Sequence, residues 1–171
     1  EWRAACQVAR HRPDHDLVDA LMAARLAEPR GDAWAFAHGM LRESLERSAQ
    51  ESGRAIELHD ACATALQIRF DVARAPGLAE RLGRHLFAAG RASEAVEPLL
   101  LGAQERSAQS NYRVAMELHE LTTEALDASG AEDDDRRRGA CAIERAALLA
   151  ALGNHDEAFA LATETAERFA E

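Results

Sequence analysis

The chain of 171 residues contains no lysine, three cysteines and few aromatic residues. The cysteines, Cys6, Cys62 and Cys141, are far apart and form no CxxC pair, so we expect neither a disulfide framework nor a metal site. We expect all three cysteines to be small core residues of a protein in the reducing cytosol. Aromatic residues make up 5% of the chain and alanine is abundant, a composition that is typical of closely packed helices.

Long apolar runs and an excess of basic charge are also lacking. No run reaches the roughly 18 apolar residues that cross a bilayer, and no signal peptide is visible. The formal net charge of −10 argues against binding to nucleic acid and to an anionic membrane surface. The sparse cysteines and the lack of a visible signal peptide indicate a cytoplasmic protein. Because the chain begins with Glu1 and not Met, we also expect it to be a piece of a longer protein.

Motifs of common enzymes are absent as well. The sequence has no GxxxxGK[ST], GxGxxG, HExxH or GxSxG segment, and no spacing nominates a catalytic pair. A chain without a phosphate-cradling loop is not expected to hydrolyse ATP. We therefore predict a non-enzymatic protein with no catalytic residue and no cofactor of its own.

The first forty residues predict a helix followed by a hairpin. Asp16 can cap a helix over residues 17–26, and residues 29–32, Pro-Arg-Gly-Asp, are typical of a turn. The next segment alternates large and small residues and predicts a strand with three side chains on one face: Trp34, Phe36 and His38. This order resembles the second half of a winged helix. The expected helix carries one basic residue, Arg25, so we do not expect it to read DNA.

From Met40 onward, apolar residues recur at helical spacing and predict an all-α array. One clean apolar stripe has five members: Ile56, His59, Ala63, Leu66 and Phe70. Pro76-Gly77 and Gly90 separate successive helices. Pro98 predicts an irregular first turn or a kink in the helix that contains it.

A repeated set of residues indicates how these helices are organised. Leu86, Gly90, Glu94 and Ala95 recur 63 positions later as Leu149, Gly153, Glu157 and Ala158. This distance is close to two helix–turn–helix repeats of about 34 residues. Small residues, among them Gly83 and Gly102, are expected where the helices of a hairpin cross. The pattern predicts a tetratricopeptide-like array of helical hairpins, an α-α superhelix whose concave face binds a protein or peptide.

Three short segments resemble those of a known family. Residues 34–45 resemble the Phe-x-His…Leu-Arg-Glu stretch that closes the winged helix of STAND-type signalling ATPases. Residues 58–61 and 82–86 are similar to the signatures that open the tetratricopeptide arms of these proteins. The resemblance implies that residues 1–38 complete a winged helix and that residues 39–171 form tetratricopeptide-like repeats.

The resemblance also implies a role. An ATPase module precedes the winged helix in such proteins, and many bacterial members carry a serine/threonine kinase or another output domain. This chain would then be a sensor or scaffold arm that contacts its own ATPase module. His38 matches the histidine that touches the ADP phosphates in related switch ATPases. The alternative is a packed histidine that anchors the strand-to-helix junction.

Two other interpretations of the whole chain stay open: a free-standing adaptor that binds a peptide or protein, and an enzyme acting inside the array. The last helix bears four residues expected to be covered by a further repeat or by a second copy in a homodimer: Phe159, Ala162, Ala166 and Phe169. His59 and His85 are expected to fill space and to make one hydrogen bond each. The run Asp133–Arg138 is interpreted as a solvated helix start.

Overall fold

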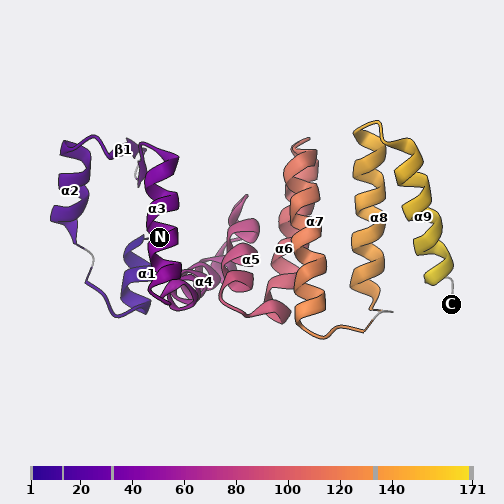
Figure 1. Ribbon diagram of the computed structural model, residues 1–171, viewed down its shortest axis with the longest axis horizontal. Coiled ribbons are helices and arrows are strands. Elements are labelled where there is room, and N and C mark those ends of the chain that lie inside the picture. Colours follow the sequence, from indigo (N-terminus) through magenta and orange to yellow (C-terminus); the bar gives the residue numbers. More distant parts are fainter. Residues whose placement is uncertain (1, 13, 32, 133–134, 170–171) are drawn as a thin grey trace.

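The fold is all-α with one small hairpin, as the sequence predicts (Figure 1). A computed structural model describes residues 2–12, 14–31, 33–132 and 135–169. Within these residues the chain forms nine α-helices and a two-stranded antiparallel sheet, and from α4 onward the helices follow one another along the length of the molecule. Among the described helices, none combines the length and the apolar character needed to cross a bilayer.

The N-terminal part contains three helices and the hairpin: α1 (Trp2–Val8), α2 (His15–Ala23), β1 (Ala27–Arg30), β2 (Ala33–Phe36) and α3 (Gly39–Glu51). The cap of α2 is Asp14 and not the predicted Asp16, because the Oδ1 atom of Asp14 accepts the backbone N–H of Leu17 at 3.2 Å. Asp16 lies in the first helical turn, where a negative charge is favourable.

The hairpin is close to the prediction but its turn is shorter. Pro29 and Arg30 lie in β1, where Pro29 is paired with Trp34, so the turn predicted over 29–32 began too early. Proline is tolerated here because both strands of a two-stranded sheet are edge strands. The rings of Trp34 and Phe36 meet edge to face with centroids 5.2 Å apart, which confirms that they share a face.

The remaining helices form the array: α4 (Ala55–Val72), α5 (Leu78–Ala88), α6 (Ala92–Ala108), α7 (Tyr112–Ala128), α8 (Arg136–Ala151) and α9 (His155–Arg168). Each of them packs against the next one in sequence, and α1 packs against α4. The largest fully buried apolar side chains lie in α5, α6 and α7: Leu82, Leu86, Leu99, Leu118 and Leu126. Helix α6 continues through Pro98, which is buried.

The predicted stripe of α4 is correct except at its first member. Ala63 and Leu66 are buried and Phe70 packs against the core, but Ile56 is 63% exposed. Ile56 lies in the first turn of α4, ahead of the part of the helix whose residues are buried. The periodicity therefore identified the correct face of the helix but not how much of its length is covered.

Two glycines set the distance between α5 and α6. A Cβ atom at Gly83 would lie 2.9 Å from the backbone nitrogen of Leu99, and one at Gly102 would lie 2.8 Å from the Cα atom of Glu80. Real Cβ atoms do not approach backbone atoms so closely. The small residues that the sequence placed at a helix crossing are thus confirmed at these two positions.

Candidate functional site

His38, the residue singled out by the family resemblance, lies just beyond the hairpin. Its extended backbone precedes α3, and its carbonyl accepts the N–H of Leu41 at 3.1 Å. The side chain is exposed and caps no backbone N–H of the helix. The alternative of a packed histidine is therefore wrong, because the side chain is exposed, and the contact of His38 with nucleotide stays a prediction.

His59 and His85 contact each other between α4 and α5. Their Nδ1 atoms are 2.9 Å apart and their ring centroids 5.1 Å apart. One ring donates its N–H and the other accepts, so each histidine satisfies a polar atom of its neighbour inside a partly buried contact. This is the space-filling, hydrogen-bonded arrangement that the sequence predicted for the two residues.

The described part of the run Asp133–Arg138, residues 135–138, forms the start of α8, as predicted. Asp135 caps α8, because its Oδ1 accepts the backbone N–H of Arg137 at 2.8 Å. The same carboxylate is paired with the Arg137 guanidinium, and these bonds lower the pKa of Asp135 to about 2. Residues 133–134 lie outside the described residues.

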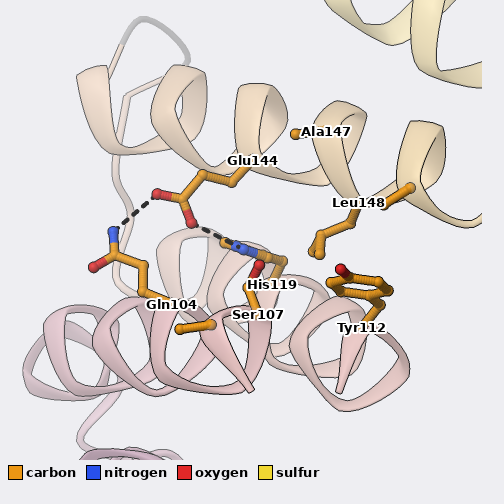
Figure 2. Close-up of a pocket in the computed structure, with 9 residues that line it drawn as sticks. Gln104, Ser107, Tyr112, His119, Glu144, Ala147 and Leu148 are labelled. Atoms are coloured by element: carbon orange, nitrogen blue, oxygen red, sulfur yellow. Dashed lines mark hydrogen bonds and ion pairs between the residues drawn. The ribbon is translucent and has the colours of Figure 1, made fainter. Parts of the chain in front are cut away.

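A cavity of about 470 Å³ opens between α6, α7 and α8 (Figure 2). Its walls combine polar side chains with small or apolar ones: Gln104, Ser107, Ala108, Tyr112, His119, Glu144, Ala147, Leu148 and Ala151. This volume falls within the range of small-ligand sites, and the mixture of apolar walls and a few polar groups is also typical of them. The sequence did not predict this site.

Three polar side chains contact one another in the wall of the cavity. The Gln104 Nε2 atom donates to Glu144 Oε1 at 2.8 Å, and Glu144 Oε2 lies 3.2 Å from His119 Nε2 (Figure 2). The side chain of His119 is 1% exposed, whereas that of Glu144 is 35% exposed. Glu144 therefore connects a buried ring to solvent.

The buried ring is only partly satisfied by its neighbours. On the far side of the ring, Cys141 Sγ lies 3.3 Å from His119 Nδ1, and its thiol donates to the His119 carbonyl at 3.4 Å. On the cavity side, His119 Nε2 is close to Glu144 but is not aligned for a hydrogen bond with it or with any other described group. An unsatisfied buried nitrogen is costly, and it faces the cavity.

Burial favours the neutral forms of the His119 ring and the Cys141 thiol. It lowers the pKa of His119, and the charge of Arg145 acts in the same direction, while Glu144 opposes the shift. Burial also raises the pKa of the Cys141 thiol, which is 2% exposed. A neutral, covered thiol is a poor nucleophile, so Cys141, His119 and Glu144 do not resemble an activated catalytic triad.

The lowered pKa of His119 predicts a loss of stability in acid. The unfolded histidine, with a pKa near 6.5, binds a proton more readily than the folded one, so the free energy of unfolding is expected to fall as the pH drops below about 6.5. Urea unfolding at about pH 7.5 and about pH 5.5 measures this fall. His119→Gln removes this titrating group and leaves the other histidines in place, so the fall in the free energy of unfolding should be smaller in the variant. An equal fall in both proteins would contradict the assignment to His119.

The sequence interpreted the three cysteines as core residues, and the structure agrees best for Cys141. Cys141 is buried, whereas Cys6 and Cys62 are half-buried, and no disulfide joins any of them in the part of the chain that the structure describes. Among the described residues, no group of three or more His, Cys, Asp or Glu side chains is placed to ligate a metal ion.

Comparison with protein-family models, with curated proteins and with solved structures found no match to this chain. The resemblance to STAND-type ATPases thus depends on residues 34–45, 58–61 and 82–86 alone.

Proposed function

We propose that this chain is a non-catalytic, protein-binding arm of a larger signalling ATPase of the STAND type. In this proposal residues 1–38 complete a winged helix, and residues 39–171 are tetratricopeptide-like repeats whose concave face binds a protein or peptide. The serial contact of α4 through α9, each helix with the next, is the observation that supports it most. Such one-dimensional packing is a property of helical repeat arrays, which present long surfaces to partners.

The exposed face of α9 supports a role in association. Phe159 is 75% exposed, and Ala162 and Ala166 follow it at helical spacing and are exposed as well. Phe169, expected on the same face, instead is half-buried, and its ring lies 3.2 Å from the position of a Cβ atom at Gly139 in α8. The apolar face of α9 therefore consists of Phe159, Ala162 and Ala166, and in the parent protein a further repeat would cover it.

The isolated chain is expected to dimerise through this face. Changing Phe159 to Ser should shift the protein toward the monomer in sedimentation velocity, because an exposed aromatic side chain supplies much of the apolar area. Val72→Ser is the matched control, since Val72 in α4 is 84% exposed and lies outside the face. A wild type that is monomeric at every concentration would contradict the prediction.

Two experiments test the proposed function. In the gene, a GxxxxGK[ST] loop some hundreds of residues upstream is expected for an ATPase parent, and its absence would favour the free-standing adaptor. Affinity capture from the source cell, with the chain and the full-length parent as separate baits, should recover one common protein. Capture by neither bait would point to an intramolecular role, in which the helices restrain their own ATPase.

A further inference from the structure

We propose that the cavity between α6, α7 and α8 binds a guanidinium group on an alkyl stem, with Glu144 as its counter-charge. This inference deepens the proposed function and rests on it, since the group would be an arginine side chain of the bound partner. A free alkylguanidine has the same chemistry and is the other possible source.

The charge of the cavity selects a cation. Among the described residues, Glu144 contacts the amide of Gln104 and the ring of His119, and burial keeps that ring neutral. Arg145, the next residue along α8, does not line the cavity and makes no described ion pair with Glu144. The charge of Arg145 acts on the His119 ring, but no described cation is paired with the Glu144 carboxylate, which is therefore available to pair with a cationic ligand.

The arrangement of acceptors favours a guanidinium. Glu144 Oε2 lies 3.2 Å from His119 Nε2, and this contact is not aligned for a hydrogen bond, so the lone pairs of the oxygen are not taken up by the ring. Glu144 Oε1 accepts from Gln104 and has a second lone pair. A guanidinium, whose planar fork has several N–H donors, can donate to both carboxylate oxygens at once.

The apolar walls provide a place for the alkyl stem. Figure 2 shows Tyr112 and Leu148 beside each other on one side of His119, with Gln104 on the other side. The methylene groups of an arginine can lie against Tyr112 and Leu148 while its charged end reaches Glu144. The hydrogen bond from Gln104 holds one carboxylate oxygen, and the other lies beside His119 Nε2.

The test titrates the purified chain with three probes and follows binding by calorimetry and by backbone amide shifts. The probes are ethylguanidinium, the blocked tripeptide acetyl-Ala-Arg-Ala-amide, and the same peptide with norleucine in place of arginine. Both guanidinium probes should bind and shift the amides around Tyr112 and Glu144, and the norleucine peptide should not. Tighter binding of the arginine peptide than of ethylguanidinium assigns the site to a protein side chain, and equal binding assigns it to a free molecule.

Two variants of equal charge separate the cavity from general electrostatics. Glu144→Gln keeps the size of the side chain and an acceptor for Gln104, and it should weaken binding about tenfold. Glu124→Gln, on an exposed position of α7, removes the same charge elsewhere and should leave binding unchanged. Amide spectra of each variant without ligand establish that it is folded.

The proposal is overturned if neither guanidinium probe saturates the chain at millimolar concentration, if norleucine binds equally well, or if Glu144→Gln binds like wild type. Its failure is distinguishable from failure of the proposed function. A partner captured equally by wild type and Glu144→Gln supports the binding arm and removes the arginine pocket. Saturable guanidinium binding with no captured protein keeps the pocket, removes the separate protein partner and leaves the intramolecular role.

Discussion

Replacing Gly102 with alanine is expected to lower the free energy of unfolding by about 3 kcal/mol and the melting temperature by roughly 10 °C. The new Cβ atom would lie 2.8 Å from the Cα atom of Glu80 and 2.9 Å from its backbone nitrogen. Backbone atoms cannot move aside as a flexible side chain can, so α5 and α6 must separate. Their separation loosens the buried contacts of Leu82 and Leu99. Thermal and urea unfolding followed by circular dichroism measure the loss.

A second glycine provides the control for this experiment. Gly39 is the first residue of α3. A Cβ atom at this position would have the Glu43 Oε1 atom, 3.9 Å away, as its nearest neighbour. Alanine at this position meets no obstacle and favours the helix, so Gly39→Ala should leave the stability unchanged or raise it slightly. If both variants were equally stable, the close approach of α5 and α6 at Gly102 would be wrong.

Replacing Arg106 with methionine is expected to lower the free energy of unfolding by about 2 kcal/mol. The Glu80 side chain is 12% exposed and accepts from Arg106 Nε at 2.6 Å and from Arg84 Nε at 3.0 Å. Methionine fills similar space but leaves the covered carboxylate with a single cation, and that cation is 41% exposed. Urea unfolding gives the difference in free energy directly.

An exposed arginine on the neighbouring helix is the control. Arg113 is 89% exposed and its Nε lies 3.8 Å from Glu117, a geometry in which an ion pair contributes little. Arg113→Met should change the stability by less than about 0.5 kcal/mol. Equal losses in the two variants would mean that covering the Glu80 carboxylate has no energetic consequence.

The sequence predicted the helical class and the small hairpin because helical and strand periodicities are local signals. The stripe of α4 and the glycines of α5 and α6 were read from spacing alone, and the structure confirms Ala63, Leu66, Gly83 and Gly102 in these roles. The errors lie at element ends. Asp14 and Asp16 are both suitable caps, and only the backbone geometry of the first turn decides between them. Ile56 lies ahead of the buried part of α4, and periodicity does not show where that part begins.

The cavity could not be predicted in the same way. Its polar residues come from three helices, and neither Gln104 nor His119 belongs to a motif that includes Glu144. His119 and Glu144 come together because α7 packs against α8, and this packing depends on the side chains of both helices. The burial of His119 is the decisive property of the site, and it is a property of the assembled structure.

The serial contact of the helices also determines which parts of the molecule can unfold separately. In the described residues, α8 and α9 are joined to the rest chiefly through α7, together with the hydrogen bond between Gln104 and Glu144. Nearest-neighbour coupling of this kind divides a chain into units that exchange their amide hydrogens at separate rates. The C-terminal pair can therefore detach while the centre of the array stays folded. Since the cavity lies at this seam, a ligand seated there would fasten the last two helices to the remainder and slow their exchange.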